Sequence, residues 1–487
     1  MMKRIGRGVG IGLAVLLAVG AVLYVAGLRV VMDGGGSPHL RFVTSPEDRA
    51  AEIARHREAQ RREGPPPEPP APPVAPRPDA GEAPAGVDAV SAGPPVTPPI
   101  PSTYWTDFRG PARDGHYQER PIRTDWPAGP LPALWKQPVG GGYASLVVAG
   151  RRAFTIEQRG SQEVVAAYDL TSGRELWTNA WNARFRESMG GDGPRATPTW
   201  HDGRVYALGG HGELRCLEDA TGRLLWRTNI LEDAGASNLQ WGMAAAPLVV
   251  DDSVIVLPGG QGGRSVVAYH TVTGRRAWSA LDDTQAYSSP MLVTLAGVRQ
   301  ILVFSESRLM GLAPGGGQVL WEFPWTTQYG VNASQPLLLS DRRVFISTGY
   351  GSGAAAIELT READGRLSVT ELWRTNRMKN QFTSSVLHDG YIYGLDEAIL
   401  ACLDASTGEL KWKGGRYGYG QVMLASGHLI VLTEGGDLAL VRATPERHDE
   451  LARFAVLEGK TWNHPAVSDG YLLVRNLNEM AAFDLRR

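Results

Sequence analysis

The sequence predicts an all-β fold, an eight-bladed β-propeller over residues 104–487, preceded by one transmembrane helix and a Pro-rich linker. Three observations predict this organisation. A phrase of the form Asp-x-Thr-x-Gly-x-x-x-Trp recurs along the chain, residues 9–28 carry no charge, and residues 64–101 are dominated by Pro, Ala, Gly and Glu.

The uncharged run 9–28 is preceded by Lys3, Arg4 and Arg7. A helix of about 20 apolar residues spans the roughly 30 Å hydrocarbon core of a bilayer. The basic residues predict that residues 1–8 stay in the cytoplasm. We therefore expect a single-pass signal anchor in the inner (cytoplasmic) membrane, with the rest of the chain in the periplasm or outside the cell. A cleaved signal peptide is the alternative, with a weak small-residue site at Val25-Ala26-Gly27.

Residues 29–103 are expected to contain a charged stalk helix and a linker. Ser45 and Pro46 predict the start of the helix, because Ser is a favoured N-cap and Pro suits the first helical position. The stretch to Glu63 alternates Glu and Arg without an apolar stripe, which predicts a solvated helix. From Gly64 to Pro101 the composition predicts an extended spacer, which at about 3.1 Å per residue would reach roughly 100 Å.

The recurring phrase predicts the blades. Its clearest copies are 167–173 followed by Trp177, and 403–408 followed by Trp412. Upstream of each copy, apolar residues alternate around an Asp-Gly or a substitute, as in residues 197–208, and this pattern predicts a hairpin. Two hairpins per repeat make the four strands of a propeller blade. The Gly permits a positive φ in the last turn, and the Trp begins the outermost strand, where it can pack against the neighbouring blade.

The two ends of the chain predict how the ring closes. Residues 482–485 resemble a third strand that has no outer strand after it, whereas 133–136 resemble an outer strand that has no blade before it. Joined, they complete one blade. The predicted outer strands are then marked by Trp135, Trp177, Trp226, Trp278, Trp321, Trp373, Trp412 and Phe454. Seven blades are the alternative, with residues 441–457 as an insertion.

Composition and motifs exclude several functions. The net charge of −2 gives no basic surface for nucleic acid. Cys216 and Cys402 are far apart and are expected to be buried thiols. The chain contains no P-loop, GxSxG or HExxH motif, and its ten His residues fall singly. We therefore predict no catalytic residue and no metal ligand.

The phrase resembles the PQQ-like repeat of the quinoprotein alcohol dehydrogenase-like superfamily, over nearly all of residues 104–487. Residues 105–115 are similar to the opening motif of a bacterial branch whose members mostly lack a known activity. The resemblance implies a propeller. It leaves function open, because the family includes dehydrogenases that bind PQQ and Ca²⁺ and also the lipoprotein propeller of the outer-membrane β-barrel assembly machinery, which binds no cofactor.

Two departures count against a dehydrogenase. The family's enzymes hold the quinone between a Trp and a disulfide of adjacent cysteines, but Cys216 and Cys402 are not adjacent. The chain also has no CxxCH haem motif. We therefore expect a non-catalytic propeller that acts as a protein-interaction or envelope scaffold with an envelope protein partner and no cofactor. The alternative is a quinoprotein-type dehydrogenase with PQQ and Ca²⁺ in the central channel.

The residues before each inner strand are expected to surround the mouth of the central channel. Amides, aromatic rings and bases in such a ring suit an anionic ligand or a peptide, although any wet channel needs polar residues. The candidates are Arg195, Trp241, Tyr287, Asn332, Asn380, Gln381, Gln421 and His464. Tyr143 precedes the first inner strand in the same way, and nearby segments add Arg184, Arg186, Arg377 and Lys379.

Overall fold

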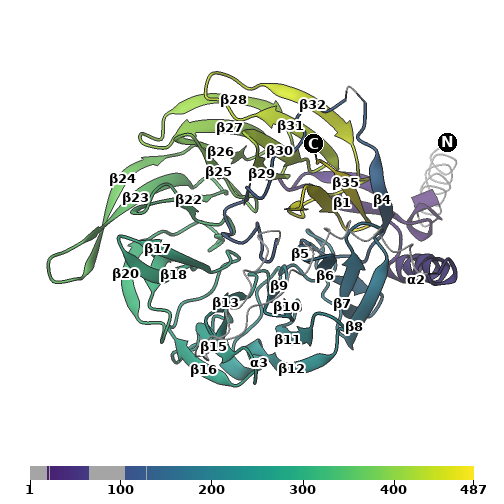
Figure 1. Ribbon diagram of the computed structural model, residues 1–487, viewed down its shortest axis with the longest axis horizontal. Helices are drawn as coiled ribbons and strands as arrows, with labels where there is room; N and C mark the ends of the chain where they lie inside the picture. Colours follow the sequence, from purple (N-terminus) through teal and green to yellow (C-terminus); the bar gives the residue numbers. More distant parts are fainter. Residues whose placement is uncertain (1–18, 21, 65–104, 128, 487) are drawn as a thin grey trace, which may run out of the picture.

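The repeats form eight sheets arranged around one axis in the computed structural model, which describes residues 19–20, 22–64, 105–127 and 129–486 (Figure 1). The predicted eight-bladed propeller is therefore confirmed. In each blade the chain runs outward through four antiparallel strands, from the axis to the rim. Seven sheets have four strands and one has five.

The strands of blades 1 to 4 follow one another along the chain. Blade 1 contains β5 (Val147–Ala149), β6 (Arg152–Arg159), β7 (Gln162–Asp169) and β8 (Glu175–Asn182). Blade 2 contains β9 (Thr199–His201), β10 (Arg204–Leu208), β11 (Glu213–Glu218) and β12 (Leu224–Asn229), followed by the short helix α3 (Ile230–Ala234). Blade 3 contains β13 (Leu248–Val250), β14 (Ser253–Val256), β15 (Val266–His270) and β16 (Arg276–Ala280). Blade 4 contains β17 (Met291–Leu295), β18 (Val298–Phe304), β19 (Arg308–Leu312) and β20 (Val319–Pro324).

Blades 5 to 8 complete the ring. Blade 5 contains β21 (Leu337–Leu338), β22 (Arg343–Thr348), β23 (Gly353–Arg361) and β24 (Leu367–Thr375). Blade 6 contains β25 (Val386–His388), β26 (Tyr391–Asp396), β27 (Ile399–Asp404) and β28 (Leu410–Arg416). Blade 7 contains β29 (Gln421–Ala425), β30 (His428–Leu432), β31 (Asp437–Arg442) and β32 (Glu450–Ala455), with β3 (His116–Tyr117) added at its inner edge. Blade 8 contains β33 (Ala466–Ser468), β34 (Tyr471–Arg475), β35 (Glu479–Asp484) and, as its outer strand, β4 (Ala133–Pro138).

The ring closes as the sequence predicts. Strand β4 pairs antiparallel with β35, with Lys136 opposite Ala481 and Trp135 opposite Ala482. The alternative of seven blades is wrong, because Phe454 lies in β32, which pairs with β31 as a regular outer strand.

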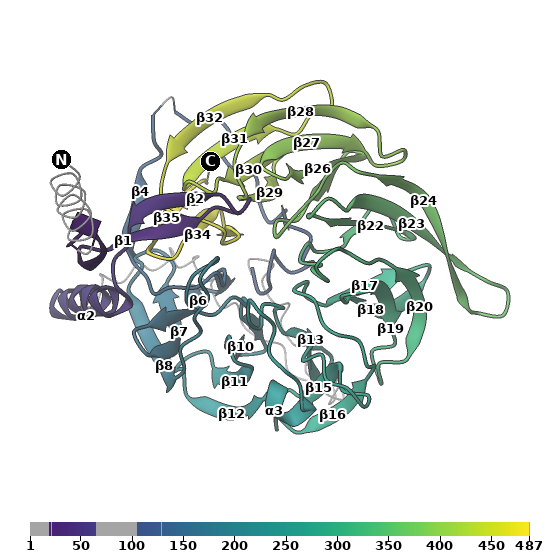
Figure 2. The ribbon, with the colours of Figure 1, turned by 180° about the vertical axis from the view of Figure 1, so that it is seen from behind.

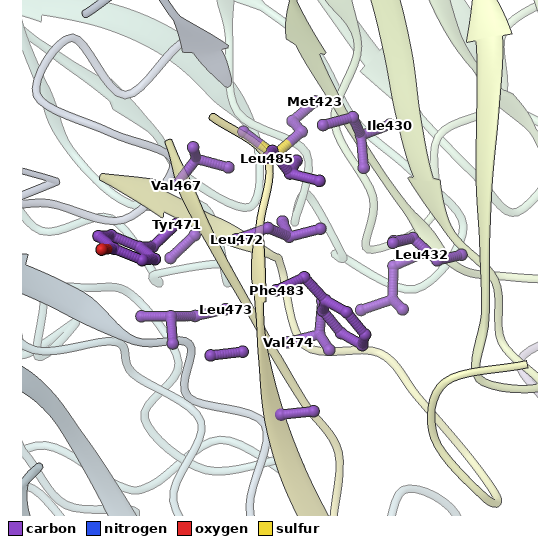
Figure 3. Packing of buried hydrophobic residues seen from close by; sticks show 14 of the residues in the cluster. Met423, Ile430, Leu432, Val467, Tyr471, Leu472, Leu473, Val474, Phe483 and Leu485 are labelled. Atoms are coloured by element: carbon purple, nitrogen blue, oxygen red, sulfur yellow. The ribbon is translucent and has the colours of Figure 1, made fainter. Parts of the chain in front are cut away.

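Apolar side chains on facing sheets hold the blades together. Between blades 7 and 8, Met423, Ile430 and Leu432 face Leu472 and its neighbours, and all of them are buried (Figure 3). A blade exposes two apolar faces, so each sheet is covered only when its neighbours are in place. The core is therefore a series of inter-blade layers.

A two-stranded hairpin and a helix precede the propeller and pack on it. The hairpin consists of β1 (Leu28–Met32) and β2 (Pro38–Phe42), which the sequence did not predict, and it lies across β34 and β35 in Figure 2. The predicted helix is present as α2 (Pro46–Arg62), with the Ser45 side chain accepting the Asp48 N–H as the N-cap.

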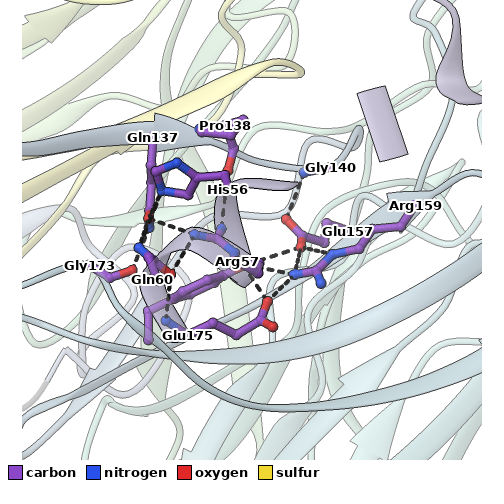
Figure 4. Close-up of polar contacts among 11 residues, drawn as sticks. His56, Arg57, Gln60, Gln137, Pro138, Gly140, Glu157, Arg159, Gly173 and Glu175 are labelled. Carbon is purple, nitrogen blue, oxygen red and sulfur yellow. Dashed lines mark hydrogen bonds and ion pairs between the residues drawn. The ribbon is translucent and has the colours of Figure 1, made fainter. Parts of the chain in front are cut away.

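The prediction of a free, solvated stalk helix is wrong. Arg57 of α2 is buried, donates to Gln137 Oε1 at 2.6 Å and to the Pro138 carbonyl at 3.1 Å, and pairs with Glu175 at 3.3 Å (Figure 4). A charged helix without an apolar stripe docks here because polar groups of the propeller satisfy its arginine.

The predicted linker and membrane anchor fall largely on residues outside the described ranges. Helix α2, which precedes residues 65–104, and residues 105–127, which follow them, both contact the ring. The expected reach of roughly 100 Å therefore does not separate α2 from the propeller. Among the described residues, no helix is both long and apolar enough to cross a bilayer. Most of the predicted span 9–28 is not among them, and Leu28 already belongs to β1. The anchor stays a prediction.

Candidate functional site

The loops that join one blade to the next gather on one face of the ring, here called the mouth face. The turns that contain Asp-Gly lie on the opposite, far face. Six half-buried or buried aromatic side chains come from six of the inter-blade loops of the mouth face: Tyr143, Trp241, Tyr287, Phe382, Tyr419 and Trp462.

Four of these aromatic rings form a continuous arc. Trp462 stacks on Tyr143 with 5.0 Å between ring centroids and lies 4.5 Å from Phe382, which is 5.9 Å from Tyr419. Trp241 and Tyr287 form a separate pair at 5.5 Å. Burial raises the pKa of Tyr287 to about 12, so its phenol stays protonated at neutral pH. The mouth thus offers flat apolar surface with protonated hydroxyl groups.

Glu434 connects the arc to the polar groups around it. Its carboxylate accepts the Trp462 Nε1–H at 2.9 Å and the Tyr419 backbone N–H at 3.2 Å. Lys460 lies 4.3 Å from the Trp462 ring centre, and burial lowers the pKa of its ammonium to about 8. These groups place one acid and one base beside the same indole.

Arg195 lies on the aromatic surface and is held by its own loop. Its guanidinium donates to the carbonyl of Gly193 at 2.7 Å and to that of Gly191 at 3.0 Å, and it lies 4.6 Å from the Phe185 ring centre. Glu187 is 3.5 Å away. Burial lowers the pKa of Arg195, although a guanidinium remains charged at neutral pH.

The turn of the N-terminal hairpin reaches this mouth. The backbone N–H of Gly34 donates to Glu434 Oε1 at 2.7 Å, and the Gly34 carbonyl accepts from Gln381 Nε2 at 2.8 Å. Gly34 also lies against the Tyr419 ring so closely that a Cβ would overlap it. The mouth therefore binds the backbone of this turn through both the N–H and the carbonyl of Gly34.

A second segment of the chain fills the channel from the far face. Residues 105–115, here called the channel plug, contact the inner ends of blades 1, 2, 3, 4, 6, 7 and 8. Arg113 is buried, donates to the carbonyls of Pro290 at 2.9 Å and Pro247 at 2.5 Å, and pairs with Asp107 at 2.9 Å. Arg109 is buried as well and donates to the Ser385 carbonyl at 2.9 Å. The plug therefore occupies the channel at this level.

Four of the eight predicted mouth residues use their side chains to hydrogen-bond neighbouring segments of the ring. Asn332 is buried, donates to the Ser305 carbonyl at 2.8 Å and accepts from Thr348. Asn380 bonds Ser385, and Gln421 donates to the Trp462 carbonyl at 2.9 Å. These amides order the inter-blade loops.

His464 is the fourth of these residues. It is buried edge-to-face against Phe108 of the plug, with its ring nitrogens 2.6 Å from the Pro465 carbonyl and 3.3 Å from that of Val422. Burial, and then the charge of Arg109, lower the pKa of His464 to about 3, so the ring is neutral. Of the predicted candidates, Arg195, Trp241, Tyr287 and Gln381 remain at the mouth surface.

Sequence reasoning missed Phe382, Tyr419, Glu434 and Trp462. Phe382 and Trp462 are within two positions of predicted residues and also precede inner strands, so the same rule would have found them. The rule could not identify Glu434, because this residue lies in the turn between β30 and β31 and not before an inner strand.

The alternative of a quinone with Ca²⁺ concerns the carboxylates and cysteines of the chain. The described residues contain no group of three or more His, Cys, Asp or Glu side chains that could hold a metal ion. Cys216 and Cys402 are free, buried thiols in blades 2 and 6, and burial raises the pKa of each to about 12. Two acids of the mouth accept from protein donors, Glu434 as above and Glu187 from the Met189 N–H at 2.6 Å.

Solved structures share the fold at low sequence identity. BamB from Moraxella catarrhalis is 14% identical with a TM-score of 0.52, and 73% of this chain aligns with 99% of that one. A europium-containing methanol dehydrogenase is also 14% identical with a TM-score of 0.59, covering 77% of this chain and 90% of that one. At this identity the likeness shows the fold alone.

Sequence comparison identifies the family. The outer membrane protein assembly factor BamB of Bordetella pertussis (strain Tohama I) is 25% identical over 321 residues, which is 62% of this chain and 72% of that protein. A family model described as outer membrane protein assembly factor BamB matches residues 161–414, just over half of the chain. This PQQ-like β-propeller therefore belongs to the family of the outer membrane protein assembly factor BamB.

Proposed function

We propose that this chain is a non-catalytic scaffold of the bacterial envelope, a propeller anchored in the inner membrane by residues 9–28 and working outside the cytoplasm with a protein partner. Family membership supports the envelope setting, since the matched family and its Bordetella relative are named as assembly factors for outer membrane proteins.

The observation that carries the non-catalytic part is the channel plug. Arg109 and Arg113 are buried in the channel and donate to carbonyls of several blades. The Arg113 guanidinium has Asp107 and three carbonyl groups as acceptors, and a buried charge with several acceptors is costly to displace. A cofactor entering this space would have to remove it.

The scaffold proposal is tested by photo-crosslinking in the native host. A photoreactive amino acid replaces Tyr329, which is exposed in a mouth-face loop, or Val272, which is exposed in a far-face turn. We expect an envelope protein to be captured from at least one site, and only after illumination. Failure at both sites, and from further exposed positions around the ring, would contradict the proposal.

The alternative, a PQQ- and Ca²⁺-dependent dehydrogenase, rests on the shared fold with methanol dehydrogenase. It predicts a quinone absorbance and bound Ca²⁺ in protein purified from the native host. It also predicts a higher melting temperature when PQQ and Ca²⁺ are added together. We expect neither effect, and either one would favour the enzyme.

A further inference from the structure

Exposed apolar side chains are concentrated at the N-terminal end of the described chain. Among the described residues, eighteen large hydrophobic side chains are exposed, and nine of them lie between residues 19 and 43: Val19, Val22, Leu23, Tyr24, Val25, Val30, Leu40, Phe42 and Val43. The other nine are scattered over residues 134–451. Single exposed hydrophobic residues are ordinary, whereas a contiguous group indicates a covered surface.

The exposed apolar residues of the hairpin lie on one of its faces, and Val31 lies on the other. Val30 is opposite Leu40, and Leu28 is opposite Phe42, in the β1–β2 ladder. Residues paired directly across an antiparallel ladder point to the same side of the sheet. Leu40 is 69% exposed and Phe42 67%. This set, Leu28, Val30, Leu40 and Phe42, is here called the outer strip.

The opposite face of the hairpin is directed toward the propeller. It carries Arg29, Arg41 and the half-buried Val31, and Arg41 lies near Gly459 in the loop between blades 7 and 8. The turn is fixed at the mouth by the bonds of Gly34 to Glu434 and Gln381. The turn therefore ties the hairpin to the ring, over β34 and β35 (Figure 2), and the exposure of Val30, Leu40 and Phe42 shows that the outer strip is not covered by the ring.

We propose that the outer strip lies in the interfacial layer of the membrane in which the N-terminal segment is anchored, so that the mouth face of the propeller is turned toward the lipid surface. This rests on the anchor proposed above. The uncharged run 9–28 ends where β1 begins, so a bilayer that holds this run is adjacent to the strip.

The residues at this junction suit a lipid interface. The Arg29 guanidinium lies 3.9 Å from the Tyr24 ring centre and donates to the Tyr24 carbonyl at 2.5 Å. Tyr and Arg are favoured at the level of the headgroups, where an apolar body and a polar tip are both accommodated. Hairpins as short as β1–β2 are marginal alone, and here the mouth supports one side and lipid covers the other.

The test uses the full chain in liposomes, with a fluorophore at a single introduced cysteine. Leu40→Cys places bimane on the outer strip, and Val272→Cys, at a position 65% exposed in wild type, places it on the far face as a matched control. The native thiols are buried in blades 2 and 6 and should remain unlabelled, which wild type verifies. Quenching is measured with brominated lipid and with aqueous iodide.

We expect brominated lipid to quench bimane at position 40 several-fold more than at position 272, and we expect iodide to quench the label at position 272 more strongly.

Co-flotation of the chain with the liposomes is measured in the same samples. If the chain floats but the label at 40 is as open to iodide as the label at 272, the interface proposal is wrong while the anchor stands. If the chain does not float, the anchor itself is overturned. If the bimane labels at position 40 of two chains lie close enough to quench each other, the outer strip is an interface between two copies of the chain, and this result would also overturn the proposal.

Discussion

The indole of Trp177 in blade 1 lies directly on the backbone of Gly222 in blade 2. Trp177 Nε1 donates to the Asp219 carbonyl at 2.9 Å, and a Cβ at Gly222 would overlap the ring. The same arrangement links Trp135 to Gly173, Trp226 to Gly274, and Trp373 to Gly408. The Gly and the Trp recur at a fixed spacing within most repeats. In the fold, the Trp of one blade packs on the Gly of the next blade.

Replacing Gly222 by Ala should lower the stability of the propeller. The residue has φ +71°, which costs an L-residue roughly 1–2 kcal/mol, and the methyl group meets the Trp177 ring, which adds about 1–3 kcal/mol. Thermal unfolding followed by circular dichroism measures the loss. Gly203→Ala is the control, since φ is +72° there but nothing lies within 4 Å of a Cβ. Equal losses in the two variants would show that the Trp contact is unimportant.

Replacing Gln137 by Pro should open the ring. Gln137 of β4 is opposite Met480 of β35, in the same alternation as Val139, whose N–H donates to the Asn478 carbonyl, so Pro removes a ladder donor and leaves a carbonyl unpaired at a cost of roughly 1–3 kcal/mol. Gln137→Ala keeps the backbone donor while losing the amide contacts with Arg57 and the Gly173 carbonyl. The melting temperature should fall much further for Pro than for Ala. Similar melting of the two variants would argue against closure through β4.

His464 should make the propeller less stable in acid. Its pKa is about 3 in the folded chain and near 6.5 when unfolded, so the neutral ring stabilises the fold fully above pH 6.5. As the pH falls from 6.5 toward 3, the unfolded chain takes up the proton and stability is lost at up to about 1.4 kcal/mol per pH unit.

The measurement is chemical denaturation at several pH values between 3 and 7. His464→Gln should be less stable at neutral pH but should show a shallower decline toward acid. His201→Gln, at an exposed position, should keep the wild-type slope. An unchanged slope in the His464 variant would contradict the prediction.

Replacing Gly34 by Val should release the hairpin from the mouth without unfolding the ring. The side chain would overlap the Tyr419 ring, and the bonds to Glu434 and Gln381 would be lost with it. Hydrogen exchange of residues 28–42 should become faster, while the melting temperature of the propeller changes little, because the blades pack without the hairpin. Gly36→Asn is the control, since φ is +81° and nothing lies within 4 Å of a Cβ there. Slow exchange in the Gly34 variant would mean that the turn is held by other contacts.

Much of the fold was predictable because the signals of a blade are local and repeated. Strand alternation around an Asp-Gly turn, as in 197–208, and the step from Gly173 to Trp177 each occupy one short continuous segment. The unmatched strands at Trp135 and near Phe483 then predicted the closure, since an unpaired edge at each end of a ring can be removed only by pairing them.

The site was predicted less well. The rule that residues before inner strands surround the mouth located Arg195, Trp241, Tyr287 and Gln381 at its surface. The same rule gave no means of knowing that His464 and Asn332 are buried and bonded to carbonyl groups. Whether a polar side chain is free or committed depends on the partners that its neighbours in space offer.

The sequence by itself determined the eight blades, the closure by β4 and the start of α2 at Ser45. Only the tertiary structure decided that the channel is filled by residues 105–115, that α2 docks through Arg57, and that Gly34 occupies the mouth. Gly34 and Glu434 are 400 positions apart, and the contact between them leaves no periodic trace in either segment. Such contacts depend on how the closed ring presents side chains of several blades to one point in space, and no local pattern encodes that.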